Sequence, residues 1–124
     1  MLNHTLNRSY EEIELAAADI VHRIGIRKNL KGYRYLITAI MICCENPQML
    51  YVLSKRLYPA VAMRHGITVP AVQQNIRRAI DTAFNENPEQ LCSLFYFRKG
   101  KPYVSEVLAT AVETVRFSMR FETP

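Results

Sequence analysis

The chain has 124 residues, of which 49% are hydrophobic and 22% are charged, and its formal net charge is +5. These values are typical of one globular domain that builds its core without disulfide or metal staples, and they exclude a disordered tail. An excess of basic residues suits a polyanionic partner, but many basic domains bind none. The positions of the basic residues are therefore better evidence for such a partner than their number.

Nothing in the sequence points to a membrane or to export. The longest near-apolar run, residues 35–44 (YLITAIMICC), is about half the length that spans a bilayer. The N-terminus lacks the basic-then-apolar pattern of a signal peptide. Three cysteines, two of them adjacent at Cys43 and Cys44, indicate free thiols in a reducing compartment. We therefore expect a cytoplasmic protein.

Apolar residues recur at helical spacing along the chain and no convincing alternating segment is present, which predicts an all-α fold. Ser9 and Glu12 have the spacing of a capping box and predict the start of the first helix, with residues 1–8 flexible before it. Gly25 predicts its end. After a short basic loop, the run 33–45 is apolar almost all round and predicts a central helix.

Helix-starting and helix-stopping residues divide the middle of the chain. Asn46, followed by proline, is predicted to end the central helix and begin another. Pro59 predicts the start of a helix that ends at Gly66. Thr68 then predicts the cap of a helix over residues 69–84.

The last third repeats this pattern. Asn87, again followed by proline, predicts a short helix leading into the aromatic cluster Phe95, Tyr96 and Phe97. The final helix is predicted from about Ser105. The sequence thus predicts a single compact domain over residues 1–124, with six or seven helices.

The helix over 69–84 is the candidate for function. At about 100° per residue its apolar side chains fall on one side and its polar ones on the other. With the turn at Gly66 it has the form of a helix-turn-helix, whose second helix lies in the DNA major groove. Glutamine can bond adenine and arginine can bond guanine. The predicted base-reading residues are Gln73, Gln74, Arg77 and Arg78.

An ordinary solvated helix surface is the alternative, because glutamine and arginine are good helix formers. Two basic clusters, at positions 27–31 and 98–101, favour DNA, since phosphate contacts often come from loops and helix ends beside the reading helix. The predicted backbone-contacting residues are Lys28, Lys31, Thr68, Arg98, Lys99 and Lys101.

No pattern indicates catalysis. The histidines His4, His22 and His65 lack a second ligand at metal spacing, and no glycine-rich phosphate loop is present. We expect no catalytic residue, metal, cofactor or small-molecule substrate, and a solvent-exposed His65 in its turn. Phe117 and Phe121 indicate either a self-association patch or a chain end folded onto the bundle.

Several stretches between Ile20 and Val115 resemble the C-terminal effector domain of the stage-zero sporulation master regulator, a DNA-binding response regulator of endospore-forming Firmicutes. Their order and spacing fit as well, which is far more specific than a lone helix-turn-helix pattern. The stretches are IGI, KGYRYL (31–36), LYP (57–59), IRRAI (76–80), SLF (93–95) and KPYVSE (101–106).

The resemblance implies an all-helical domain that controls transcription at the initiation of sporulation, with the helix after Thr68 as its recognition helix. It implies two copies on repeated sites of double-stranded DNA, joined partly through the last helix, and it makes RNA polymerase a candidate partner. Arg77 matches an arginine of the family's recognition helix, whereas Arg78 replaces a histidine. Gln73 and Gln74 replace Glu-Arg, so we expect a different base sequence to be read.

Family members carry a phosphorylatable receiver domain before this effector, and only about a dozen residues precede the first helix in this sequence. We expect either an excised domain or a stand-alone relative without a receiver domain. A second hypothesis is a protein-interaction module or antagonist that keeps the fold but has altered or lost operator recognition. Pro70 and Ala71 replace polar residues of the family, and Pro70 motivates this hypothesis together with the two glutamines.

Overall fold

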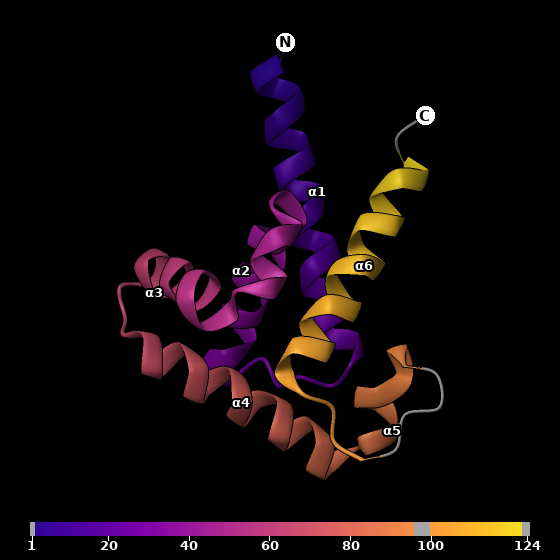
Figure 1. Cartoon of the computed structure of the whole chain (residues 1–124). Helices are drawn as coiled ribbons and strands as arrows, with labels where there is room; N and C mark the ends of the chain where they lie inside the picture. Colours follow the sequence, from indigo (N-terminus) through magenta and orange to yellow (C-terminus); the bar gives the residue numbers. More distant parts are fainter. Residues whose placement is uncertain (1, 96–99, 123–124) are drawn as a thin grey trace.

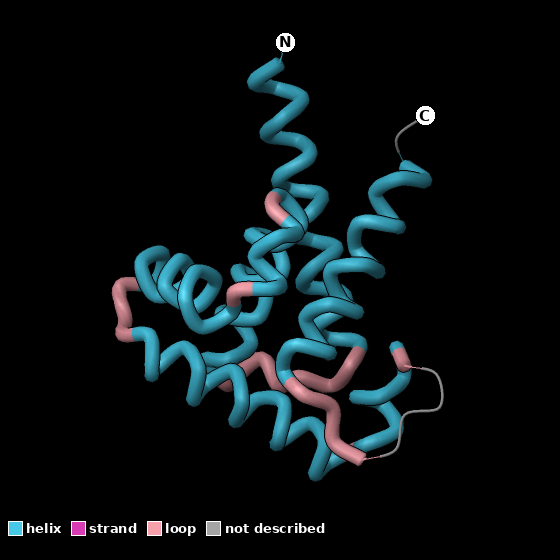
Figure 2. Tube along the Cα trace, in the orientation of Figure 1, coloured by secondary structure: helices cyan, strands magenta, loops and turns pink. Residues whose placement is uncertain are grey.

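The computed structural model describes residues 2–95 and 100–122, and the side chains of residues 10–95 and 100–120. Figures 1 and 2 show helices and connecting loops, and the described residues contain no strand, which confirms the predicted all-α class. The elements are α1 Leu2–Arg23, α2 Lys31–Glu45, the 3-10 helix η1 Pro47–Tyr51, the π-helix η2 Leu53–Leu57, α3 Tyr58–His65, α4 Val69–Glu86, α5 Pro88–Leu91, the 3-10 helix η3 Cys92–Leu94 and α6 Val104–Glu122.

Helix α2 is the centre of the domain, as its apolar sequence predicts, and packs against α1, α4 and α6. Leu36, Ala39 and Ile40 of α2 are buried together with Leu108 and Ala111 of α6. Each large apolar side chain removed from water contributes about 1.5–3 kcal/mol to folding. In Figure 1, α4 crosses one end of this bundle, while the N-terminal part of α1 and the C-terminal part of α6 project from the other end.

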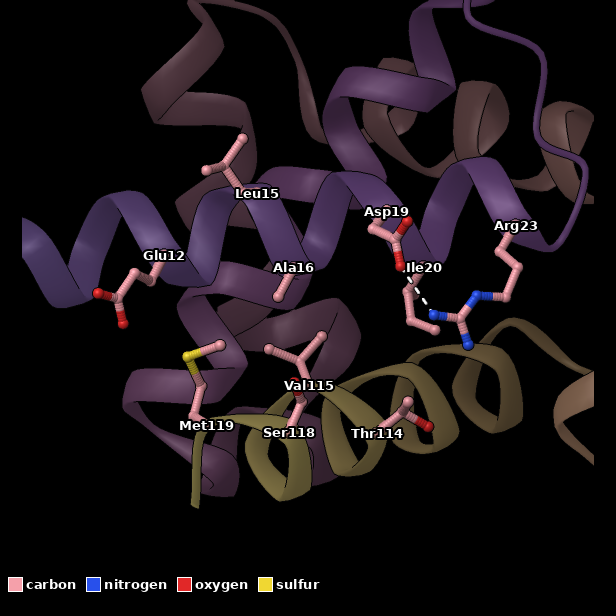
Figure 3. Close-up of a pocket in the computed structure, with 10 residues that line it drawn as sticks. All are labelled: Glu12, Leu15, Ala16, Asp19, Ile20, Arg23, Thr114, Val115, Ser118 and Met119. Atoms are coloured by element: carbon pink, nitrogen blue, oxygen red, sulfur yellow. Dashed lines mark hydrogen bonds and ion pairs between the residues drawn. The ribbon is translucent and has the colours of Figure 1, made fainter. Parts of the chain in front are cut away.

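Helices α1 and α6 run side by side with a shallow cleft of about 330 Å³ between them. Figure 3 shows Ala16 and Ile20 of α1 turned toward Val115 of α6. At the end of α1, Arg23 Nη2 lies 2.8 Å from Asp19 Oδ2, one helical turn away. None of the described helices is long and apolar enough to cross a membrane.

The first helix begins earlier than its capping motif predicts. Because α1 starts at Leu2, Ser9 and Glu12 lie inside it, and the predicted capping box is wrong. Residues 2–8, expected before the first helix, belong to it. No glycine or proline precedes Gly25, so no residue forces a boundary at Ser9.

The end of α1 is confirmed. Gly25 has a φ of 88°, the left-handed conformation that glycine adopts without strain. Its N–H donates to His22 O at 3.0 Å, and the Ile26 N–H donates to Val21 O at 3.2 Å. These bonds satisfy carbonyl groups that the helix leaves without partners at its C-terminus.

After α2 the chain is less regular than predicted. Asn46 ends α2, as expected, but its side chain makes no capping hydrogen bond. In place of one α-helix, a 3-10 turn with Pro47 at its start is followed by one π-helical turn, with Val52 between them. The predicted start at Pro59 holds to within one residue, since α3 begins at Tyr58.

Gly32 brings the backbones of α2 and α4 into direct contact. A Cβ atom added at this buried glycine would collide with the carbonyl oxygen of Asn75 and would lie 2.7 Å from the Cβ of Ala79. Both obstacles belong to the rigid middle of α4, so neither can move without shifting that helix. Glycine is therefore required at this position to let α4 rest on α2.

Replacing Gly32 with alanine should lower the free energy of unfolding by about 1–3 kcal/mol, because the extra methyl group overpacks the contact. In an uncrowded helix the same change would stabilise the protein by about 1 kcal/mol. Urea unfolding of the wild type and the variant measures the difference in their free energies of unfolding. Lys31→Ala, at the exposed neighbouring position, should change the value by less than about 0.5 kcal/mol. A more stable Gly32→Ala protein would show that α2 and α4 lie farther apart.

Candidate nucleic-acid interface

Helices α3 and α4 are joined by a short turn whose residues act as predicted. Gly66 is in the left-handed conformation, with a φ of 65°, and the Ile67 N–H donates to Ala62 O at 3.0 Å. Thr68 then begins α4, because its Oγ1 accepts a hydrogen bond from the Ala71 N–H at 3.2 Å. The two helices and this turn form a helix-turn-helix.

One face of α4 is buried against the bundle, in agreement with the helical periodicity of its sequence. The helix packs against α2, α3 and α5. Because its apolar side chains fall on this buried face, most of its polar side chains are left on the opposite face. The buried residues are Val72, Ile76, Ala79, Ile80 and Ala83.

The opposite face of α4 carries a small hollow of about 210 Å³, which we call the α4 hollow. It is lined by Pro70, Gln73, Gln74 and Arg77. Gln74 and Arg77 are exposed and Gln73 is half-buried. Three of the four predicted base-reading residues are thus brought together, because positions three and four apart lie on one side of a helix.

Pro70, which is not among the predicted base-reading residues, completes the α4 hollow. Its spacing of three residues before Gln73 and seven before Arg77 is the signal that would have placed it there. A proline in the first turn of a helix loses no hydrogen bond, since that N–H has no intrahelical acceptor. It therefore presents an apolar surface beside three polar side chains.

Arg77 also lies close to the first helix of the pair. Burial raises the pKa of the Tyr58 hydroxyl, and the positive charge of Arg77 opposes that rise. Tyr58 is the first residue of α3 and is buried. The charge of Arg77 is therefore near enough to α3 to act on Tyr58, while its side chain remains exposed at the α4 hollow.

A comparison with known protein families identifies this arrangement. The family described as the C terminal of the sporulation initiation factor Spo0A matches residues 17–115. The chain belongs to the Spo0A C-terminal family. This is a DNA-binding regulatory family that supplies the effector part of a sporulation response regulator, and it is not an enzyme family. The match contains all of α2, α3 and α4, and so the whole helix-turn-helix.

Arg78 lies apart from the other candidates of this Spo0A-type domain. It is exposed but does not line the α4 hollow. Its neighbour one turn along the helix is Asp81, whose Oδ1 is 2.8 Å from Lys101 Nζ. Arg78 therefore belongs to the flank of α4 that faces the segment before α6.

Three of the predicted backbone-contacting residues lie beside α4. Thr68 caps its N-terminus and is exposed. Lys31 is exposed and precedes Gly32, which touches the middle of α4 at Asn75. Lys101 pairs with Asp81 of α4. Thr68 thus lies at the start of α4 and Lys101 contacts its far half, while Lys31 is next in sequence to the residue that touches its middle.

The other predicted backbone contacts are not gathered at α4. Lys28 lines a different hollow, between α1 and α2. Its neighbour Arg27 is paired through Nε with Glu86 Oε2 at 3.5 Å. Arg98 and Lys99 lie outside the described residues, as do Tyr96 and Phe97 of the predicted aromatic cluster.

His65 differs from its prediction as a solvent-exposed turn residue. It is half-buried, and its Nε2 lies 2.8 Å from Thr38 Oγ1. The edge of its ring also meets Tyr35, with ring centroids 4.9 Å apart. Both partners lie on α2, about 30 residues away in the chain, so local sequence carries no sign of them. His65 anchors the end of α3 to the central helix.

The packing of His65 predicts a dependence of stability on pH. Burial lowers its pKa below the usual 6.5, and the nearby charges of Arg34 and Arg64 lower it further. As the pH falls through 6.5, the unfolded chain takes up a proton that the folded protein resists, so the free energy of unfolding should decrease.

The comparison protein is His65→Gln, whose amide can still bond Thr38 but does not titrate. Urea unfolding between about pH 7 and pH 5 should show a steeper loss of stability in the wild type than in this variant. The carboxylates are common to both proteins, so their contribution cancels. Parallel curves would show that the pKa of His65 is not lowered in the folded protein.

Proposed function

We propose that this domain is a sequence-specific regulator of transcription that reads double-stranded DNA by placing α4 in the major groove. The observation that carries the proposal is the α4 hollow, where Gln73, Gln74 and Arg77 share the exposed face of a helix whose other face is buried. The chain's membership of a DNA-binding family supports it.

The chemistry of the α4 hollow suits base edges. A glutamine amide can donate to adenine N7 and accept from its N6 amino group, and an arginine can donate twice to guanine, at O6 and N7. Pro70 offers an apolar surface of the kind that contacts a thymine methyl group. Arg78, on the flank of α4, would reach either a neighbouring base pair or the adjoining phosphates.

Phosphate contacts would hold the helix in register. Thr68 is exposed at the start of α4, and Lys31 is exposed next to Gly32, whose backbone touches α4. Lys101 would have to exchange Asp81 for a phosphate, and this costs little because surface ion pairs contribute only about 0–1 kcal/mol. Arg98 and Lys99 would add contacts from the segment predicted to flank the duplex, whereas Lys28, which lines the hollow between α1 and α2, is not placed at the duplex.

A second copy of the domain is proposed to bind beside the first on repeated sites. A hollow of about 710 Å³ between η1 and α6 is lined by Tyr51, which is 88% exposed, and Phe117, which is 57% exposed. These apolar surfaces support contact between protomers through the last helix. Phe121 lies outside the described side chains. RNA polymerase is proposed as the further partner of the DNA-bound regulator.

Selection of bound duplexes from a random pool, followed by titration, tests the function. Arg77→Ala should weaken binding to the selected site by about 1–3 kcal/mol if the arginine bonds a guanine, and should relax the preference at that base pair. Arg34→Ala is the matched control, because Arg34 is exposed on the side of α2 turned away from Gly32 and α4. Its affinity for the selected duplex should not change.

The outcomes separate the roles of the residues. An equal loss on every sequence would make Arg77 a phosphate contact, and a binding constant that hardly varies with salt would contradict the basic residues' contacts with phosphate. If the wild-type protein selects no sequence, α4 is not a base reader. The alternative of a protein-interaction module with the same fold would then be favoured.

A further inference from the structure

We propose that the groove between α1 and α2 is a docking site for an acidic amphipathic helix of a partner protein. The groove encloses about 550 Å³ and is bordered at one side by the end of α3. We call it the α1–α2 groove. It is separate from the α4 hollow and shares none of its residues.

The shape of the α1–α2 groove fits a helix. On α1 it is lined by Tyr10, Glu14 and Ala18, and on α2 by Tyr33, Ile37 and Met41. Each set repeats every four residues, so the groove follows both helices for about 12 Å, or two helical turns. A groove lined by two rows of mostly apolar side chains, one row from each helix, is the kind of site that an amphipathic helix occupies in helix-in-groove recognition.

Part of the rim of the groove is apolar and open to solvent. Leu15 is 72% exposed and Tyr10 is 42% exposed. Figure 3 shows the Leu15 side chain pointing away from α6, so the packing of α1 on α6 does not cover it. An apolar rim that stays in water is typical of a macromolecular interface, whereas a small ligand would be enclosed.

The charges around the groove select an acidic partner. Lys28, Arg34 and Arg64 all line it, against the single carboxylate of Glu14. Within the part of the chain that the structure describes, none of these three cations has a carboxylate at ion-pair distance. Arg64 Nη1 makes only a long hydrogen bond of 3.4 Å to Tyr10 Oη. Carboxylates flanking the apolar stripe of a docked helix would complement the positive potential of these three side chains.

The position of the groove makes DNA a poor occupant. Gly32 marks the face of α2 that touches α4. Ile37 and Met41 lie roughly 140° and 180° around α2 from it, at 3.6 residues per turn. The groove therefore opens on the side of α2 away from α4. A duplex held by the outer face of α4 and a helix held in the α1–α2 groove would occupy different sides of the domain.

Fluorescence anisotropy with designed peptides tests the proposal on the full chain. The probe is a labelled helical peptide of about 18 residues with a leucine stripe flanked by glutamates. One control peptide has every glutamate replaced by lysine, and another has the same composition in an order that destroys the stripe. The acidic amphipathic peptide should bind at least about ten-fold more tightly than either control.

Variants assign the binding to the groove. Arg34→Glu and Leu15→Ser should each weaken peptide binding at least about ten-fold, because they reverse a rim charge and remove an exposed apolar contact. Arg56→Glu, an exposed arginine of η2 outside the groove, should leave it unchanged. All three changes are at exposed positions, and matching thermal midpoints would verify that the fold is intact. DNA binding by Arg34→Glu should stay close to that of the wild type.

Four results would overturn the proposal. Equal binding of all three peptides, or binding that ignores both groove variants, would show that the groove is not their site. If the peptide fails to bind and Arg34→Glu loses its affinity for DNA, the cations around the groove bind DNA phosphates instead. Failure of the peptide to bind, with concentration-dependent self-association that Leu15→Ser abolishes, would assign the groove to a second copy of the chain.

Discussion

The contact between α2 and α4 at Gly32 sets the geometry on which the proposed DNA-binding face depends. There the carbonyl oxygen of Asn75 occupies the space that any larger residue would fill. Because backbone rather than long side chains makes the contact, α4 rests directly on the central helix and has little freedom to tilt. Asn75 turns its own amide back to Ala71 O, at 2.7 Å, and so leaves the contact clear.

Two surfaces of different chemistry follow from the central position of α2. On one side α2 supports α4, whose outward face presents Gln73, Gln74 and Arg77. On the other side it forms a groove with α1 that is apolar in its floor and cationic at its rim. His65 joins the two regions, since it ends α3 immediately before the turn into α4 and bonds Thr38 of α2. A helix docked in the α1–α2 groove would lie against that anchor.

The features predicted correctly from sequence are those that local chemistry determines. Gly25 and Gly66 end helices because they adopt a left-handed conformation, and Thr68 and Asn87 begin helices because their side-chain oxygens accept backbone N–H bonds. The buried face of α4 follows from helical periodicity in the same way. These rules need only a few neighbouring residues. The same rules predict that the base-reading candidates lie on the outward face of α4.

The predictions from sequence are wrong where contacts between distant parts of the chain determine the local structure. The capping motif at Ser9 has no effect because the chain before it is already helical, and the segment after Asn46 forms 3-10 and π turns as it passes over α2. The partners of His65 and the cations around the α1–α2 groove come from separate helices. No short stretch of sequence shows that Lys28 lies with Arg64 rather than with α4.

Mapping backbone amide shifts by NMR while a selected duplex is added tests the central claim, that the outward face of α4 meets the DNA. The largest changes should fall at Thr68 and along Gln73, Gln74 and Arg77, whereas Leu15 and Ile37 in the α1–α2 groove should change little. Large changes confined to the groove, with α4 unaffected, would contradict the account.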